Sequence, residues 1–386
     1  MIFNSLGSNY NLKFVLKTLF AVNNRKYRDD LISFLNKKYG GKTVLLYKGR
    51  ETIKLALDLL KLPKGSKVGI NGFTCYVVYK SIVDAGYKPV LIDIDKTLNF
   101  SYSELEKYKD LKVVIVQNTL GIPCDIEKIK RYCVANNIIL IEDLAHSVGL
   151  IYKNGQEAGT LGDFAALSFS QDKMIDSVSG GALVVRNTKY QNFSNLVFRN
   201  TSLQSQVKDR LYPLWTYKIR NTYGLGMGKV LHYILKKLSL LSQPLSSDLK
   251  IIFHNLPNWY CSLIKYQFFQ HTSDLSHCKK ISAIYAKNIN NKVIVNTASD
   301  MRFPILVNKR TELLEYLKVR GIFLSDIWYD APIAPEKMLK LTDYDGECPV
   351  AEEISSKIIN LPTHINVSLK QAKHISDKIN IWLNTQ

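Results

Sequence analysis

The sequence predicts an α/β protein with a mostly parallel sheet sandwiched by helices, followed by a smaller C-terminal α/β domain. Between about residues 43 and 187, short apolar runs rich in β-branched residues alternate with helical patterns. These runs lack the strict apolar–polar alternation of half-exposed strands, which is typical of strands covered on both faces by helices. From about residue 290 similar patterns resume over a shorter stretch, which indicates the second domain.

The individual elements follow from local patterns. Strands of the large sheet are expected at residues 67–70, 89–92, 112–116, 138–141 and 164–169, and another after the turn at 179–181. Helices are expected at 52–60, at 75–85 and after Asp125, where apolar residues recur at helical spacing. The small domain should contain a strand at 303–307 and helices at 310–320 and 367–383. We therefore divide the chain into an N-terminal helical segment (1–42), a large domain (43–285) and a small domain (286–386).

The composition of the 386 residues excludes several classes of protein. An apolar fraction of 46% with 22 Tyr and 15 Phe excludes a disordered chain, and 20 Gly with 11 Pro exclude a collagen-like one. No apolar run is long enough to span a bilayer, and Lys17 interrupts the N-terminal apolar stretch, which suits an amphipathic helix better than a secretory signal. Six Cys without a CxxC pair or zinc-type spacing predict reduced thiols in a cytoplasmic protein and no metal site.

The formal net charge of +19 has two explanations. It maintains solubility, or it attracts an anionic partner such as nucleic acid, a lipid surface or a phosphorylated small molecule. Because the basic residues are spread along the chain and do not form one block, we do not expect a nucleic-acid partner.

Residues 200–250 form a basic segment within the large domain, with Lys and Arg interleaved with Leu, Tyr, Trp and Ile. Its part at 225–240 is typical of a basic amphipathic helix. Two interpretations stay open: the helix packs on the large domain or on a dimer partner, or it contacts an anionic membrane surface. The second interpretation would place the protein at the inner face of the membrane.

Three features carry chemical information. Asp143 follows an expected strand, at the edge of the sheet where open α/β folds bind ligands. Lys173 follows the expected strand 164–169, where it is either a solvated side chain or an amine that attacks a carbonyl group. Gly49 opens an expected helix, whose free backbone N–H groups favour a phosphate. Each feature alone also fits an ordinary turn, surface side chain or helix start, but together they match what pyridoxal phosphate requires: a phosphate seat, an anion for its pyridinium nitrogen and an amine for its aldehyde.

The chain resembles the DegT/StrS family of sugar aminotransferases, which are fold-type-I pyridoxal-phosphate enzymes. The resemblance covers about residues 43–190 well and 295–383 moderately. Its motifs, in order, are Gly49–Leu57, Asn71–Cys75, Ala85–Asp95, Ile141–Gly149, and Ser168-Phe169 with Lys173 and Gly180-Gly181.

The resemblance implies a role for each matching residue. Lys173 would bind the cofactor aldehyde covalently and later move a proton between carbon atoms. Asp143 would pair with the pyridine nitrogen, and His146 would contact the ring or its hydroxyl group. The phosphate would be held by Ser168 and by the backbone around Gly49, Arg50 and Glu51.

Some positions depart from the family pattern. Cys75 stands where the family often has an aromatic residue against the cofactor, with Phe73 or Tyr76 as substitutes. A partner-subunit Asn-x-Arg motif appears as Asn258-Trp259-Tyr260, so Asn258 carries over and the arginine does not. The residues expected to line the substrate pocket are Asn118, Trp328 and Tyr329, although ordinary packing would also explain them.

The resemblance implies a homodimeric aminotransferase. Its amino donor would be glutamate, and its acceptor a keto sugar, nucleotide-linked, in the synthesis of amino sugars or cell-surface polysaccharides. Lys173 argues against the sugar 3-dehydratase branch of the family, where a histidine replaces that lysine. The alternative from another class is an inactive peripheral-membrane or scaffold protein that retains the fold, which the basic 200–250 segment motivates.

Overall fold

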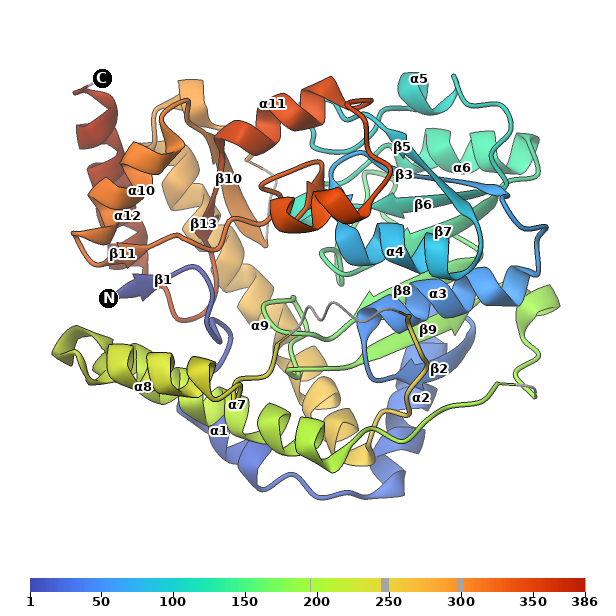
Figure 1. Ribbon diagram of the computed structural model, residues 1–386, viewed down its shortest axis with the longest axis horizontal. Helices are drawn as coiled ribbons and strands as arrows, with labels where there is room; N and C mark the ends of the chain where they lie inside the picture. Colours follow the sequence, from blue (N-terminus) through green and yellow to red (C-terminus); the bar gives the residue numbers. More distant parts are fainter. Residues whose placement is uncertain (195, 244–249, 298–300, 386) are drawn as a thin grey trace.

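The computed structural model describes residues 1–194, 196–243, 250–297 and 301–385. Residues 244–249, which belong to the predicted basic segment, lie outside the described residues. A seven-stranded sheet with helices on both faces forms the large domain, and a smaller sheet with its own helices lies beside it (Figure 1). The predicted fold class is therefore confirmed.

The large sheet has the strand order β2-β9-β8-β7-β6-β3-β5. Its strands are β2 (Lys42–Leu46), β3 (Lys67–Asn71), β5 (Lys88–Ile92), β6 (Val113–Gln117), β7 (Ile139–Asp143), β8 (Phe164–Ser168) and β9 (Gly181–Val185). The five strands from β8 to β5 run parallel, whereas β9 is antiparallel to both of its neighbours. The carboxyl ends of the parallel strands therefore lie along one edge.

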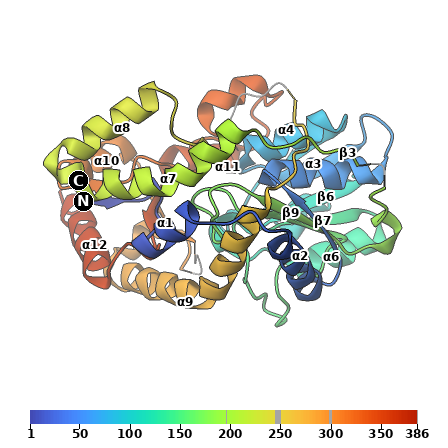
Figure 2. The ribbon, with the colours of Figure 1, turned by 90° about the horizontal axis from the view of Figure 1, so that it is seen from below.

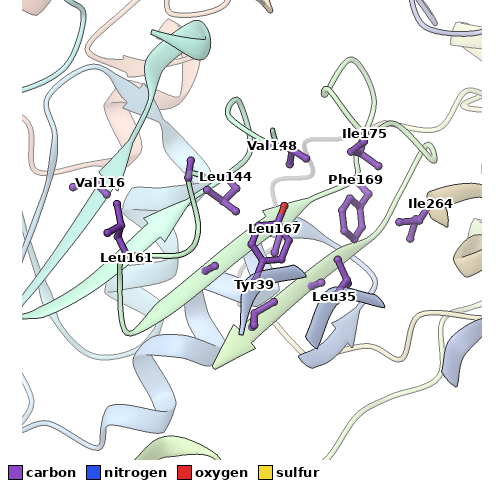
Figure 3. Packing of buried hydrophobic residues seen from close by; sticks show 14 of the residues in the cluster. Leu35, Tyr39, Val116, Leu144, Val148, Leu161, Leu167, Phe169, Ile175 and Ile264 are labelled. Carbon is purple, nitrogen blue, oxygen red and sulfur yellow. The ribbon is translucent and has the colours of Figure 1, made fainter. Parts of the chain in front are cut away.

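Helices cover both faces because alternate side chains of each strand point to opposite sides. On one face, α3 (Gly49–Leu60) and α4 (Tyr76–Asp84) pack on Val113, Ile115 and Leu183. On the other, α2 (Arg25–Tyr39), α6 (Ile126–Ala135) and α9 (Asn258–Asn288) pack on side chains that include Leu167 and Val184. Figure 3 shows this second core, with side chains of α2, β8 and α9 pointing toward one another. This double burial explains why the strands read as continuous apolar runs.

The small domain is built on an antiparallel pair, β10 (Arg302–Leu306) and β13 (Ile358–Pro362). Its helices are α10 (Arg310–Lys318), α11 (Pro349–Lys357) and α12 (Leu369–Leu383). Helix α9 extends from the face of the large sheet to this domain (Figures 1 and 2). The predicted domain boundary at 285–286 falls within the last turn of α9, so this helix contributes to both cores.

Two short strand pairs connect distant parts of the chain. Strand β4 (Thr74–Cys75) pairs with β12 (Ile333–Ala334), which brings residues near 330 to the edge of the large sheet. Strand β1 (Ile2–Phe3) pairs with β11 (Ile322–Phe323) of the small domain. The predicted N-terminal helical segment therefore holds a strand as well as α1 (Leu12–Leu19) and α2.

The described part of the basic segment is mostly helical. It contains α7 (Leu203–Thr222) and α8 (Met227–Lys237), and α8 coincides with the expected amphipathic helix. The remaining short helix, α5 (Tyr102–Leu105), lies at the far side of the large sheet (Figure 1). Within the described ranges, every helix is too short or too polar to cross a membrane.

Candidate active site

A cleft of about 270 Å³ lies at the carboxyl ends of β6, β7 and β8. The N-terminus of α3 and the segment 326–335, which β12 attaches to the sheet, complete its walls. Of the residues singled out from the sequence, those that line the cleft are Gly49, Arg50, Cys75, Asp143, His146, Ser168, Lys173, Trp328 and Tyr329.

Lys173 lies in the turn after β8, and its ammonium nitrogen reaches the side chain of His146. Lys173 Nζ is 3.1 Å from His146 Nε2 and 4.4 Å from the centre of the Trp328 ring. Burial lowers the pKa of Lys173, although the nearby Cys75 and Asp143 oppose this effect. Burial therefore makes the ammonium group easier to deprotonate than that of an exposed lysine, and the amine is the nucleophilic form.

His146 is neutral, because burial, followed by the charges of Lys173 and Arg302, holds its pKa well below the usual value. Its Nδ1 accepts a hydrogen bond from the backbone N–H of Leu120 at 3.2 Å. The single proton of the neutral ring then belongs on Nε2, which faces Lys173. When Lys173 is deprotonated, the imidazole can donate this hydrogen bond to its amine and so orient it.

The neighbouring side chains of Glu142 and Asp143 point to opposite sides of β7 and have different roles. Glu142 accepts hydrogen bonds from the backbone N–H groups of Gly159, Leu161 and Gly162, at 2.6–2.7 Å, and fixes that loop. Asp143 lines the cleft, where the N–H of Ala145 donates to its Oδ1 at 2.9 Å. Burial raises the pKa of Asp143 despite this bond, so a cationic group of a ligand would stabilise its ionised form.

The start of α3 lies directly against the end of β8. A Cβ atom at Gly49 would come within 2.5 Å of Ser168 Oγ, so this approach requires glycine. The helix N-terminus, with its partial positive charge, and the Ser168 hydroxyl group thus lie side by side in the wall of the cleft. Arg50 also lines the cleft. The arrangement suits a phosphate group.

Trp328 and Tyr329 both contact the imidazole of His146. The Trp328 ring stacks on the imidazole with centroids 5.0 Å apart, and Tyr329 Oη is 3.3 Å from His146 Nδ1. Asp326 accepts a hydrogen bond from Trp328 Nε1 at 3.1 Å and pairs with Arg302, whose guanidinium lies 4.1 Å from the centre of the indole ring. These contacts hold the indole over Lys173.

The N-terminal segment, residues 2–10, contacts the turn that carries Lys173, which we call the lysine turn. Ser8 Oγ donates to Asp172 Oδ1 at 2.5 Å, and Asn9 Nδ2 donates to the carbonyl oxygen of Lys173 at 2.9 Å. Asp172 has a left-handed backbone conformation, with φ of 61°. Contacts from distant residues therefore fix a turn that local sequence does not favour.

Three residues singled out from the sequence lie outside the cleft wall. The carboxylate of Glu51 turns to His254, accepting from its backbone N–H at 2.9 Å. Asn118 is buried and donates from Nδ2 to the Tyr152 hydroxyl at 2.9 Å. Asn258 begins α9, where its backbone N–H donates to the side chain of Asn23.

Phe73, near Cys75, and Tyr260, which replaces the arginine of the partner-subunit motif, both pack inside the chain. Phe73 is fully buried and stacks on Tyr329 at 4.8 Å, so it supports the cleft wall from behind. Tyr260 is fully buried too, and its hydroxyl donates to Asp209 at 2.7 Å. Both aromatic rings are therefore committed to packing within the chain.

Sequence reasoning missed several residues of the cleft wall, namely Lys48, Gln117, Ser170, Gln171, Asp172 and Asp326. Gln117 had a usable signal, because it ends β6 beside Asp143 on β7 and so belongs to the same sheet edge. Asp326 had no such signal in the sequence, because it reaches the site only through the two-residue pairing of β12 with β4. No group of three or more His, Cys, Asp or Glu side chains that could hold a metal ion occurs in the described part of the chain.

The cleft meets the three requirements of pyridoxal phosphate on its own geometry. It has the N-terminus of α3 beside the Ser168 hydroxyl group for the phosphate, a buried carboxylate that a cation would stabilise, and a buried lysine with a lowered pKa. These groups line one cavity, and pyridoxal phosphate would need all of them together.

Comparisons with known proteins agree with this chemistry. The model of the DegT/DnrJ/EryC1/StrS aminotransferase family matches residues 20–223 and 264–380. GDP-perosamine synthase of Escherichia coli O157:H7 is 26% identical over 344 residues, covering 86% of this chain and 83% of that protein. The dTDP-3-amino-3,6-dideoxy-alpha-D-galactopyranose transaminase of Aneurinibacillus thermoaerophilus is 23% identical, with coverage of 86% and 83%.

A solved structure shows the same fold. PseC of Helicobacter pylori, an aminotransferase involved in the biosynthesis of pseudoaminic acid, superposes with a TM-score of 0.75 at 17% identity, covering 99% of this chain and all of that one. Together with the family match over most of the chain, these findings establish that the protein belongs to the DegT/DnrJ/EryC1/StrS family of pyridoxal-phosphate-dependent aminotransferases.

Proposed function

We propose that the protein binds pyridoxal phosphate in this cleft and transfers an amino group from L-glutamate to a nucleotide-linked keto sugar. The product would be an amino sugar for cell-surface polysaccharide or related synthesis. The observation that carries the proposal is the convergence of Lys173, His146 and Asp143 in one buried cleft beside a phosphate seat. We also propose that the protein works as a homodimer in the cytoplasm.

The residues of the cleft would divide the binding of the cofactor. Asp143 would hold the protonated pyridine nitrogen. This ion pair would offset the unfavourable effect of burial on the ionised carboxylate. Ser168 and the N-terminus of α3, with Arg50, would hold the phosphate. When bound, the cofactor supplies an electron sink that stabilises negative charge on the substrate carbon.

Lys173 would attach to the cofactor aldehyde and then, once released by the incoming amine, move a proton between two carbon atoms. Its lowered pKa suits both roles, because it must lose a proton readily and accept one again. Neutral His146 would keep the amine oriented, and the hydroxyl of Tyr329, which lies 3.3 Å from His146 Nδ1, would hold the imidazole in place. Burial raises the pKa of Tyr329 far above its usual value, so its hydroxyl remains a hydrogen-bond donor.

The substrate class is supported by relatives and by charge. Two of the relatives are named for nucleotide-linked sugars, GDP-perosamine and a dTDP-amino-dideoxygalactose. A net charge of +19 favours a diphosphate substrate. We also propose that residues 225–240 contact an anionic membrane surface.

The proposed function can be tested by the visible absorption spectrum of the protein loaded with pyridoxal phosphate, before and after addition of L-glutamate. We expect a band of covalently held cofactor that collapses toward the pyridoxamine phosphate form, and that a suitable keto-sugar nucleotide restores. A band that glutamate leaves unchanged would refute glutamate as the donor. The absence of any band would favour the inactive scaffold alternative.

The lowered pKa of Lys173 gives a second test. The amine form reacts with the aldehyde, so the rate of cofactor uptake should rise with pH and level off once the amine dominates. Because burial lowers the pKa below the ordinary 10.5, the plateau should come at lower pH than for an exposed lysine. Stopped-flow absorbance between about pH 6 and about pH 10 would measure this, with N-acetyl-lysine as the reference amine. A protein whose uptake rate rises in parallel with that reference would contradict the assignment.

A further inference from the structure

We propose that helices α1 and α8, which flank α7, form a face that docks the protein on an anionic lipid surface. The proposal goes beyond the aminotransferase reaction and does not depend on it. It widens the amphipathic helix expected from the sequence into a surface made from two segments about 200 residues apart.

Helix α8 has two apolar stripes, and one of them is exposed. Leu235 is buried against the fold, and Gly228 allows close packing, because a Cβ atom there would come within 2.3 Å of the Ile219 carbonyl oxygen on α7. The second stripe consists of side chains at helical spacing that are 44–65% exposed: Met227, Val230, Ile234 and Leu238. A helix that is already anchored thus presents an apolar stripe to the outside.

Helix α1 repeats this arrangement. Its buried side holds Phe14, Val15 and Thr18. On its outer side and just beyond its end, further apolar side chains are exposed: Leu12, Leu16, Phe20 and Val22. The same helix exposes Lys13 and Lys17.

Helix α7 joins the two. It packs against both α1 and α8, and the view from below shows it lying between them (Figure 2). Arg210 donates to the carbonyl oxygens of Leu19 and Ala21, and Arg220 to that of Tyr10, so α7 is tied to the chain before and after α1. The three helices therefore form one connected layer.

The exposed charge of this layer is positive, because its one acidic residue, Asp209 of α7, is buried and accepts hydrogen bonds inside the fold. Residues 210–243 contain six basic and no acidic residues, and residues 1–28 contain five and none. The lysines of the layer that are exposed are Lys13, Lys17, Lys218, Lys229, Lys236 and Lys237. Apolar side chains bordered by lysine are the pattern by which interfacial helices bind anionic lipids.

A second copy of the chain fits this face less well. A two-fold interface would set the same patch against itself and bring its lysines together without a compensating carboxylate. Both α1 and α8 also lie outside the residues that the family model matches, 20–223 and 264–380. The family match therefore does not account for these two helices.

Co-sedimentation of the whole protein with vesicles tests the proposal. We expect binding to phosphatidylcholine vesicles that contain about 30% phosphatidylglycerol, and at least tenfold weaker binding to phosphatidylcholine alone. One lysine near an anionic surface contributes roughly fivefold to partitioning, so the triple variant Lys229→Glu/Lys236→Glu/Lys237→Glu should bind at least about 100-fold more weakly. The matched control, Lys64→Glu/Lys96→Glu/Lys109→Glu, makes the same charge change at exposed lysines outside the layer and should retain most of the binding.

The apolar part of the face needs its own variants. Val230→Ser/Ile234→Ser on α8 and Leu12→Ser/Leu16→Ser on α1 should each weaken vesicle binding at least tenfold, whereas Val134→Ser/Leu341→Ser should not. Turnover with dissolved substrates should stay unchanged in all of them, because none lines the cleft. If the variants of only one helix weakened vesicle binding and those of the other left it unchanged, the proposal that both helices form the docking face would be wrong.

The mass in solution separates lipid docking from self-association. Light scattering of the α8 double variant should give the mass of the unchanged protein. A halved mass would show that a second copy covers the stripe and would overturn the proposal, as would equal binding of the unchanged protein to neutral and anionic vesicles.

Discussion

Replacing Lys173 by alanine is expected to abolish covalent binding of pyridoxal phosphate and to lower turnover by at least about 10⁴-fold, the upper range for one acid–base group. Lys173 would provide both the amine that attaches to the cofactor and the group that moves the proton, so both functions are lost together. Its environment is specific, since Nζ lies 3.1 Å from His146 Nε2 and burial lowers its pKa. The measurement is borohydride reduction followed by peptide mapping, together with the rate of amino transfer.

Two further variants make this result specific. Lys173→Arg keeps the positive charge but not the nucleophile, and should fail as completely as the alanine variant. The other lysine among the described residues of the cleft wall is Lys48. Its Nζ donates a hydrogen bond to Ser179 Oγ at 2.7 Å. Lys48→Ala should still hold the cofactor covalently at saturating concentration. Reduced cofactor found on the peptide of Lys48 in the unchanged protein would refute the assignment.

Replacing Asp143 by asparagine should leave the cofactor bound but lower turnover by about 10²–10³-fold, the usual cost of one preorganised electrostatic partner. The amide retains the shape of the side chain and can still accept from the N–H of Ala145. It cannot hold the pyridine nitrogen in its protonated form, so the ring draws electrons less strongly. Stopped-flow measurement of the reaction with L-glutamate would give the rate.

The matched control for Asp143→Asn is Glu142→Gln, which makes the same kind of substitution one residue away, on the opposite side of the strand. Glu142 accepts three backbone hydrogen bonds and does not line the cleft, so its variant should lose thermal stability and keep most of its turnover per folded molecule. A rate for Asp143→Asn within about fivefold of the unchanged protein would show that this carboxylate does not serve the cofactor nitrogen.

The sheet and its functional edge could be predicted from the sequence because both depend on local patterns. The apolar run before Glu142 is long enough for a buried strand, and a polar pair at its end must lie at the sheet edge. The same reasoning places Lys173 and Gly49 near that edge, since each follows or opens an element of the same α/β unit. In the structure all three elements meet at one cleft.

The direction of individual side chains could not be predicted, because it depends on partners far away in the sequence. Glu51 is one residue from the cleft wall, but His254, 203 residues later, captures its carboxylate. Asn118 directly follows β6 beside the site, but its amide donates a hydrogen bond to the hydroxyl group of Tyr152. Trp328 stacks on His146 because a two-residue strand, β12, fixes the chain just after it.

The N-terminal segment has a consequence for how the chain reaches its native state. Its contacts span nearly the whole sequence: Ile2 pairs with Ile322, Asn366 donates to the carbonyl oxygen of Ser8, and Ser8 in turn supports the turn that carries Lys173. The parallel sheet can form from neighbouring βα units while the chain is still being synthesised, but this segment must wait for residues made more than 300 positions later. We therefore expect the lysine turn to be among the last parts to order, so that a nascent chain acquires its scaffold well before it acquires a competent catalytic centre.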